Sequence, residues 1–391
     1  MNNKRARLFC FLLAAMMICG NFCPTAFAEV YQPGLTIDAK AAILVEPVTG
    51  KILFEQNPDE RLALASVTKV MTILLIYESV GQDKIKWDDV VSVSDHAASM
   101  GGSQIFLEPN EQQTVRDLTK AIVIASANDA AVAMAEFIAG SEESFVSLMN
   151  KRAAELGMQN TCFKNACGLD DDGHFSSARD IAIMSRALIT KYPEVQDYTT
   201  VWQDTITHKT KRGEEEFGLT NTNKLLKWYK GATGLKTGST GKALYCLSGT
   251  AERDGLKLIS VILASPSPIT RFQEVIKMLD YGFANFKIAE GEAVGTSVGT
   301  VKINKGVLEE AEVTVKDMVG TVVEKGSTEA LESEIVIEEH MNAPIAEGTK
   351  AGEIIYKYKG AEIGRSDLVI KEEIKKARYI DVVEKLRKIW R

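Results

Sequence analysis

Hydrophobic residues near the start of the chain fall into two short runs, at residues 41–46 and 51–55. The four residues between the runs begin with Pro47 and end with Gly50, and both residue types supply turn geometry. Two β-prone segments joined by such a turn predict a β-hairpin.

Apolar residues then recur mainly at helical spacing up to about residue 190. The segment from Ser66 to Leu75 predicts a buried helix with a serine at its start. Thr114 can cap another helix, because Asp117 follows three residues later. Other elements are expected further along the chain: helices at 129–138, 143–156, 178–190 and 271–286, and a second hairpin with strands 243–252 and 256–264 around the turn 253–255.

Beyond residue 287 the pattern changes to short alternating segments, such as residues 300–303, 312–315 and 334–337. Glycines separate these segments. Alternation with a period of two predicts strands, so residues 287–370 are expected to form a small β domain. The part before it, residues 29–286, mixes helices with antiparallel hairpins and predicts an α+β domain.

The last segment, residues 371–391, has apolar residues at helical spacing, eight basic side chains and four acidic ones. Its net charge is therefore +4. A basic amphipathic helix with Trp390 near its end predicts a helix lying at the interface of an anionic membrane. A helix packed against its own β domain is the alternative that the pattern leaves open.

Residues 1–28 have the three parts of a secretory signal peptide: a basic start, the apolar run from Leu8 to Ile18 and a small-x-small end at Ala26 to Ala28. The apolar run is shorter than the ~20 residues that a spanning helix needs, which disfavours a permanent anchor. Cleavage before Glu29 is expected, and with it export of the protein.

Composition narrows the class of protein further. The chain has 391 residues, 45% of them hydrophobic, and a net charge of −7. These values exclude a disordered chain and a protein with many membrane spans, and the length suggests two or three domains. Loss of residues 1–28 changes the net charge to −10, and the body from 29 to 370 carries −14. An acidic body gives no reason to expect a nucleic-acid partner.

Three cysteines remain after the signal peptide: Cys162, Cys167 and Cys246. An odd number in a large domain is not a disulfide framework. A bridge between Cys162 and Cys167 stays open, whereas Cys246 lies in a strand-like apolar run and is expected to be buried as a small apolar side chain.

Two Ser-x-x-Lys patterns occur, and only one has a suitable setting. Ser66 and Lys69 lie on the expected helix, where positions i and i+3 share a face. Ser239 and Lys242 lie in a glycine-broken strand or turn, where positions i and i+3 point to opposite faces.

Two further motifs follow in a fixed order. Ser126 and Asn128 form a Ser-x-Asn motif at the junction of two expected helices, and residues 236–238 read Lys-Thr-Gly just before an apolar strand. Each motif alone is weak. Their order after Ser66 and Lys69 is the signature of active-serine enzymes that react with penicillin.

The segments 65–72, 124–131, 168–180 and 234–238 resemble the D-alanyl-D-alanine carboxypeptidases, the low-molecular-mass penicillin-binding proteins. The resemblance covers essentially the whole mature chain. It implies a penicillin-binding/β-lactamase-like transpeptidase fold, with an antiparallel sheet flanked by helices and a helical subdomain. It also implies a secreted enzyme that trims the terminal D-alanine from peptidoglycan pentapeptides, is acylated by β-lactams and uses neither metal nor cofactor.

The resemblance and the needs of acyl transfer together imply a role for each site residue. Ser66 would be the nucleophile, activated by a neutral Lys69 whose pKa is lowered by burial and by repulsion from Lys236. Ser126 would relay the proton to the departing D-alanine. The remaining expected roles are these: Asn128 orients Lys69 and the substrate amide, Lys236 and Thr237 hold the substrate carboxylate, and the backbone N–H groups of Ser66 and Ser239 form the oxyanion hole.

Two further positions concern substrate recognition. Arg271 is a weaker candidate for carboxylate recognition, with an exposed helix arginine as the alternative. Cys167 stands where many relatives carry His or another polar residue, which puts a role of this position in substrate handling in doubt.

Other functions are disfavoured. The four histidines are scattered and no His-Glu-x-x-His motif occurs, so metal catalysis has no ligand cluster. His174 is expected to pack in a loop. A β-lactamase of the same fold would need a dedicated deacylating Glu, where the loop instead has Asp170, Asp171 and Asp172. A catalytically inactive wall-binding scaffold is disfavoured because all three motifs are intact.

Overall fold

The computed structural model describes residues 34–210, 213–381 and 383. The expected signal peptide lies outside these residues, as do residues 382 and 384–391 of the expected C-terminal helix. Within them, no helix combines the length and the apolar character needed to span a bilayer.

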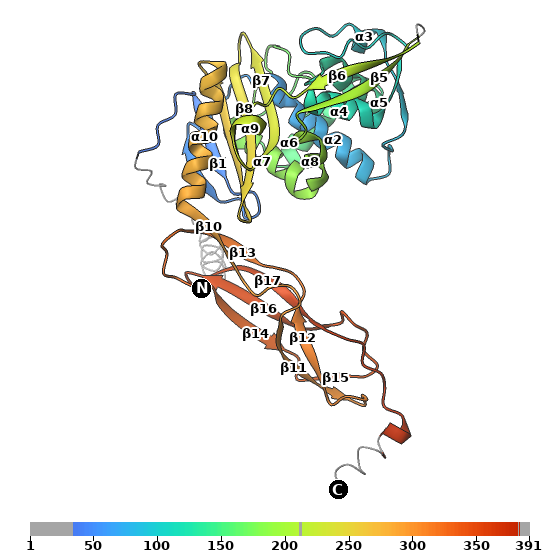
Figure 1. The fold of residues 1–391 in the computed structure, drawn as a ribbon, viewed down its shortest axis with the longest axis vertical. Coiled ribbons are helices and arrows are strands. Elements are labelled where there is room, and N and C mark those ends of the chain that lie inside the picture. Colours follow the sequence, from blue (N-terminus) through green and yellow to red (C-terminus); the bar gives the residue numbers. More distant parts are fainter. Residues whose placement is uncertain (1–33, 211–212, 382, 384–391) are drawn as a thin grey trace, which may run out of the picture. The chain divides into compact units, whose positions relative to one another are not determined.

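A five-stranded antiparallel sheet forms the centre of the first part of the chain (Figure 1), with strand order β2-β1-β9-β8-β7. Its strands are β1 (Ala41–Val45), β2 (Ile52–Gln56), β7 (Ala232–Thr240), β8 (Leu244–Arg253) and β9 (Leu256–Ser265). Both expected hairpins, β1–β2 and β8–β9, are confirmed.

Helices cover both faces of this sheet because its strands are apolar on both sides. In β1, Ala42 and Leu44 belong to one core and Ile43 and Val45 to the other. Helix α10 (Pro268–Asn285) packs on the first face and α7 (Ala178–Lys191) on the second.

The second core extends into a helical subdomain built around α2 (Lys69–Gly81), whose residues 69–79 are all buried. Around it lie α4 (Val115–Ile124), α5 (Asn128–Ala139) and α6 (Glu142–Glu155). Thr114 caps α4 by accepting the N–H of Asp117, as expected. The predicted helices are confirmed to within a few residues.

Short elements complete this part: η1 (Ala65–Thr68), β3 (Val90–Ser92), α3 (Asp95–Ala98), β4 (Gln112–Thr114), η2 (Pro193–Val195), α8 (Gln196–Thr199), β5 (Gln203–Thr210), β6 (Gly213–Thr220) and α9 (Leu225–Trp228). The β5–β6 hairpin was not predicted. Its strands are almost entirely polar, and only Ile206 and Leu219 are buried, so neither strand shows a clear apolar alternation.

The second part of the chain is all β, as predicted. Strand β10 (Phe286–Glu290) pairs with β13 (Gly320–Glu324). A six-stranded sheet follows the order β14-β16-β17-β12-β11-β15, with these bounds: β11 (Ser297–Asn304), β12 (Glu310–Val315), β14 (Glu332–Ile337), β15 (His340–Asn342), β16 (Lys350–Tyr358) and β17 (Ala361–Ile370). All its pairs are antiparallel except β11 with β15.

The helix expected over 371–391 does not begin at residue 371. Ile374 is buried in the core of the β domain and pairs with Ile345, and the N–H of Ala377 donates to the carbonyl of Lys305. Helical geometry starts at Tyr379. Because Ile374 belongs to the core of the β domain, the helix begins eight residues, or about two turns, later than expected.

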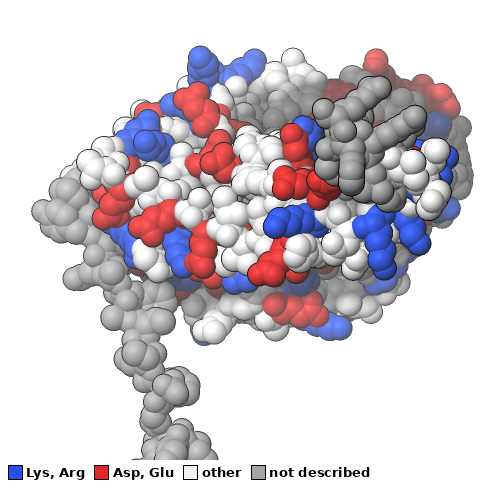
Figure 2. Space-filling view, turned by 90° about the horizontal axis from the view of Figure 1, so that it is seen from below, with Lys and Arg blue, Asp and Glu red and all other residues white. Residues whose placement is uncertain are grey.

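Charged side chains of both signs are intermixed on the face shown in Figure 2, where the described residues present no large region of one sign. Neighbouring charges also pair within the β domain, for example Lys350 with Asp367 at 2.7 Å and Arg365 with Glu362 at 2.8 Å.

Candidate active site

Ser66 lies in the short turn η1, immediately before the buried helix α2. Lys69 is the first residue of α2, is fully buried, and places its Nζ 3.1 Å from Oγ of Ser66. The i, i+3 spacing of the motif therefore brings the two groups onto one face, as predicted.

Lys69 has two further partners, and both are acceptors. Its Nζ lies 2.5 Å from Oδ1 of Asn128 and 2.7 Å from the carbonyl oxygen of Cys167. A protonated lysine donates three hydrogen bonds, and these three partners use all of them. A neutral amine keeps two N–H groups, which the two carbonyl-type oxygens can accept. Its lone pair is then left for the hydroxyl of Ser66.

The Ser126–Asn128 motif connects α4 to α5. Ser126 has a positive φ of 63°, which a serine adopts only when its surroundings require it. The backbone N–H of Asn128 donates to the carbonyl of Ser103 at 2.7 Å, and its Nδ2 donates to the carbonyl of Gly101 at 2.6 Å. With Nδ2 held in this way, Oδ1 faces Lys69.

Strand β7 supplies the Lys-Thr-Gly motif. Nζ of Lys236 lies 2.8 Å from Oγ of Ser126, and Oγ1 of Thr237 lies 2.6 Å from Oγ1 of Thr222. Ser239 lies two residues beyond Thr237, on the same face of the strand, and is exposed. The structure thus joins Ser66, Lys69 and Asn128 by direct contacts, and Lys236 to Ser126 by another.

Gly238 allows this strand to approach the nucleophile. A Cβ atom at this position would lie 2.8 Å from the carbonyl oxygen of Leu64 and 3.0 Å from the backbone nitrogens of Ser66 and Val67. Such contacts are too short for any residue with a side chain. The absent Cβ therefore brings the backbone of β7 beside that of Ser66.

Burial decides the electrostatics of the two lysines. Desolvation lowers the pKa of Lys69 to about 8, and the buried Asp129 partly opposes this effect. Desolvation also lowers the pKa of Lys236 well below its usual value, with repulsion from Lys69 and Arg271 as smaller causes. The expected lowering at Lys69 is thus due to burial, and the repulsion between the lysines acts on Lys236.

Arg271 is buried, so the alternative of an exposed helix arginine is wrong. Its Nη1 donates to the carbonyl oxygens of Gly238 at 3.0 Å and Cys246 at 3.3 Å. Burial lowers the pKa of Arg271 to about 10. The guanidinium therefore supports β7 at Gly238, the last residue of the Lys-Thr-Gly motif.

The loop from Asn165 to Gly173 closes the other side of the site. Gly168 has a φ of +89°, and a Cβ there would collide with the backbone of Ala65. Oγ1 of Thr240 donates to Asp170 at 2.6 Å, which joins this loop to the end of β7. The loop provides Lys69 with one hydrogen-bond acceptor, the backbone carbonyl of Cys167. This contact does not depend on the side chain at position 167.

The thiols of Cys162 and Cys167 are free, so the bridge left open by the sequence is not formed. Cys246 is buried in β8, as expected. His174 packs in the loop, as predicted: its Nε2 lies 2.7 Å from Oγ1 of Thr68, and its Nδ1 accepts the N–H of Lys164. Burial lowers the pKa of His174 to about 4.

Asp129 is a site residue that the sequence reasoning missed. Its carboxylate is fully buried and accepts the backbone N–H groups of Ile105 and Leu107 at 3.1 Å each. Burial raises the pKa of Asp129, and these N–H bonds oppose that rise. The sequence did offer a signal for Asp129, because it is a single acidic residue in the otherwise apolar start of α5. A carboxylate buried there requires hydrogen-bond donors from the residues around it. Thr222 was missed as well, because no motif includes it.

In the part of the chain that the structure describes, no group of three or more His, Cys, Asp or Glu side chains could hold a metal ion.

Comparison with known proteins agrees with this geometry. A model of the peptidase S11 family, described as D-alanyl-D-alanine carboxypeptidase, matches residues 26–267, and a model described as the penicillin-binding protein 5 C-terminal domain matches residues 287–376. The D-alanyl-D-alanine carboxypeptidase DacF of Bacillus subtilis (strain 168) is 43% identical over 390 residues, which cover 98% of each protein.

Solved structures show the same fold. A peptidoglycan synthesis regulatory factor (PBP3) from Streptococcus pneumoniae is 29% identical with a TM-score of 0.73, over 87% of this chain and 100% of that one. Penicillin-binding protein D2 from Listeria monocytogenes, in its ampicillin-bound form, is 36% identical with a TM-score of 0.54, over 64% of this chain and 100% of that one. The penicillin-binding fold expected from the resemblance is thereby confirmed. The peptidase S11 model matches more than half of the chain, and the Bacillus subtilis relative is 43% identical over 98% of it. The chain therefore belongs to the peptidase S11 family of D-alanyl-D-alanine carboxypeptidases.

Proposed function

We propose that the protein removes the terminal D-alanine from peptidoglycan pentapeptides through an acyl-enzyme on Ser66. One observation carries this assignment. Among the described residues, Lys69 has two carbonyl-type acceptors besides Ser66, so its neutral form offers a lone pair to the serine hydroxyl. A pKa of about 8 makes that neutral form accessible near physiological pH.

In the acylation step, Oγ of Ser66 attacks the carbonyl carbon between the two D-alanines and its proton passes to Lys69. The backbone N–H groups of Ser66 and Ser239 stabilise the oxyanion. The close approach of β7 to η1 at Gly238 supports this role, because it brings the strand that carries Ser239 beside the backbone nitrogen of Ser66.

Ser126 relays the proton that Lys69 took from Ser66 to the nitrogen of the departing D-alanine as the C–N bond breaks, so that Lys69 is neutral again for deacylation. Its contact with Lys236, at 2.8 Å, supports this relay. Lys236 and Thr237 hold the carboxylate of the terminal D-alanine, and Arg271 supports their strand from behind. The approach of that carboxylate restores the charged form of Lys236, since an opposite charge favours it.

Water then attacks the acyl-enzyme, releases the shortened stem peptide and returns the proton to Ser66. A β-lactam takes the place of the substrate in acylation and leaves a long-lived adduct. The ampicillin and cefotaxime complexes of penicillin-binding protein D2 from Listeria monocytogenes support this reaction with β-lactams.

Location and domain organisation complete the proposal. Residues 1–28 act as a signal peptide, residues 29–286 form the catalytic domain and residues 287–370 form the small β domain. The basic segment at the C-terminus attaches the enzyme to the outer face of the cytoplasmic membrane. Its net charge and its spacing of apolar residues support this attachment.

Incubation of the purified protein with labelled penicillin and with a D-Ala-D-Ala peptide tests the function. We expect one penicillin bound per chain at Ser66, and D-alanine released from the peptide. Because Lys69 must be neutral to accept a proton, the acylation rate should rise as the pH increases through about 8. Absence of both the adduct and released D-alanine would refute the assignment, and rapid repeated turnover of penicillin would indicate a β-lactamase instead.

The membrane proposal is tested by removing residues 379–391. We expect the full chain to sediment with membranes and the shortened chain to stay in the supernatant, because the apolar face and half of the segment's net charge of +4 are lost. Release of D-alanine from a soluble peptide should be equal in the two forms. A shortened chain that remains in the membrane fraction would contradict the attachment.

A further inference from the structure

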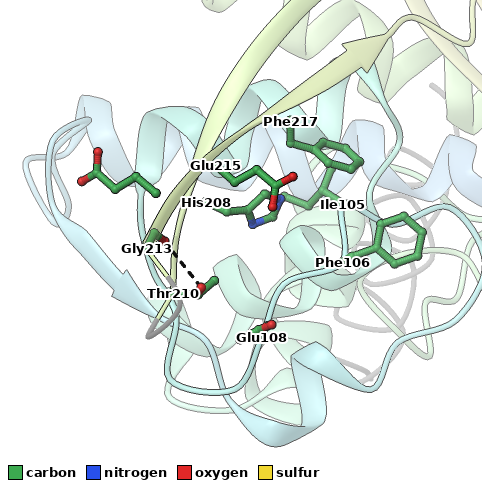
Figure 3. Close-up of a pocket in the computed structure, with 9 residues that line it drawn as sticks. Ile105, Phe106, Glu108, His208, Thr210, Gly213, Glu215 and Phe217 are labelled. Atoms are coloured by element: carbon green, nitrogen blue, oxygen red, sulfur yellow. Dashed lines mark hydrogen bonds between the residues drawn. The ribbon is translucent and has the colours of Figure 1, made fainter.

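A pocket lies between the β5–β6 hairpin and the segment Ile105–Glu108, and His208 lies within it (Figure 3). His208 belongs to β5, and its ring stands edge-on to Phe217 of β6 with 5.3 Å between the ring centres. Phe217 in turn contacts Phe106. The hairpin thus packs its aromatic side chains against this segment.

Beside the pocket, His208 contacts a buried carboxylate. Nδ1 of His208 lies 2.7 Å from Oε1 of Glu111, whose side chain has no exposed surface. The same carboxylate accepts Nε2 of Gln113 at 2.7 Å and the backbone N–H of Glu108 at 2.9 Å. Gln113 also donates to the carbonyl of Thr207, at 2.9 Å, which ties the group to β5 a second time. Through Glu111, the histidine therefore holds one end of the segment.

The other end leads to the catalytic lysine. Asp129 accepts the N–H groups of Ile105 and Leu107, and it follows Asn128 directly in α5. Asn128 is bonded to the carbonyls of Gly101 and Ser103 and accepts Nζ of Lys69. Residues 101–108 are thus one continuous segment, fixed to the Lys69 acceptor at one end and to the His208–Glu111 pair at the other.

We propose that His208 is a positioning residue for acyl transfer: its imidazolium anchors Glu111, which fixes the segment that holds Asn128 against Lys69. This inference rests on the proposed role of Lys69 as the base. His208 does not touch the reacting atoms. It acts by keeping the amide oxygen of Asn128 where it accepts one N–H of the lysine and leaves the lone pair for Ser66.

Protonation of His208 strengthens the anchor. The hydrogen bond to Glu111 raises the pKa of His208, and the backbone of Ile105 and the charge of Asp129 raise it further. Glu108, Glu214 and Glu215 also line the pocket and favour the imidazolium. The pKa of Glu111 is lowered by its bond to His208, although burial acts in the opposite direction. Each partner thus favours the ionised form of the other, and the pair weakens as the pH rises above the pKa of His208.

Replacement of His208 with Gln removes the charge and keeps a donor of similar size. We expect His208→Gln to be acylated by penicillin about ten-fold more slowly than wild type at pH 6, since small misplacement near a reacting group is costly. The ratio of wild-type to variant rates should shrink towards about two-fold as the pH is raised from 6 to 9, because His208 of the wild type progressively loses the same charge.

Two further variants separate positioning from general stability. His340→Gln makes the same change at an exposed histidine of β15 and should match wild type at every pH. Glu111→Gln removes the main cause of the raised pKa of His208. The pH at which the acylation rate of this variant responds to His208 should therefore be lower than in the wild type. Rates are measured per titrated active site, well below the unfolding temperature, so that unfolded protein does not contribute.

A His208→Gln rate equal to wild type at pH 6, or a deficit that stays constant from pH 6 to pH 9, would overturn the proposal. Failure of wild type and His340→Gln to form the Ser66 adduct would instead overturn the proposed function. The two failures are therefore distinguishable in one set of measurements.

Discussion

Ser66→Ala is expected to abolish acylation by penicillin and to reduce release of D-alanine by about 10⁴-fold or more, because the enzyme loses its only proposed nucleophile. Lys69 and Asn128 keep their contact in this variant, so the fold should be unaffected. Intact-protein mass spectrometry detects the adduct, and a D-alanine assay measures turnover.

Ser147→Ala is the matched control. This serine lies on the exposed side of α6, where its hydroxyl donates to the carbonyl of Glu143, and it is remote from the motif residues in the sequence. It should be acylated like wild type. A penicillin adduct on Ser66→Ala, at any residue and at the wild-type rate, would show that Ser66 is not the nucleophile.

Gly238→Ala is expected to slow acylation by about 100-fold, although it adds only one methyl group. The new Cβ would lie 2.8 Å from the carbonyl of Leu64 and 3.0 Å from the nitrogen of Ser66. Both are backbone atoms, so relief requires β7 or η1 to move, and such a movement separates the two groups of the oxyanion hole. Overpacking of this kind also destabilises a fold by roughly 1–3 kcal/mol.

Gly241→Ala provides the comparison for this variant. Gly241 lies three residues further along, and a Cβ there meets no atom within 4 Å. Its acylation rate and unfolding temperature should stay close to wild type. Equal rates for Gly238→Ala and Gly241→Ala would contradict the close approach of β7 to the nucleophile.

Much of the fold could be predicted because its elements have strong local patterns. The apolar helix that starts at Ser66, the cap formed by Thr114 and the turn at residues 253–255 all depend on neighbours in the sequence. The motif residues could be found for the same reason, since a helix brings Ser66 and Lys69 together without help from the rest of the fold.

The remaining features depend on contacts between distant segments. The β5–β6 hairpin has too few buried side chains for its pattern to be recognised, and its His208 finds Glu111 97 residues away. Asp129 is fixed by N–H groups more than 20 residues earlier. The start of the C-terminal helix was placed too early because the segment 371–378 belongs to the β domain through contacts of Ile374 with distant residues, such as its bridge to Ile345.

The backbone contact between Lys69 and Cys167 has an evolutionary consequence. A carbonyl oxygen is present in every residue, so mutation at position 167 leaves this hydrogen bond available as long as the glycine beside it preserves the path of the loop. The identity of the side chain is therefore open to drift, while Gly168 is constrained by its positive φ and by the backbone of Ala65. Selection for a functional catalytic lysine would act on the glycine and not on the residue that contacts the lysine.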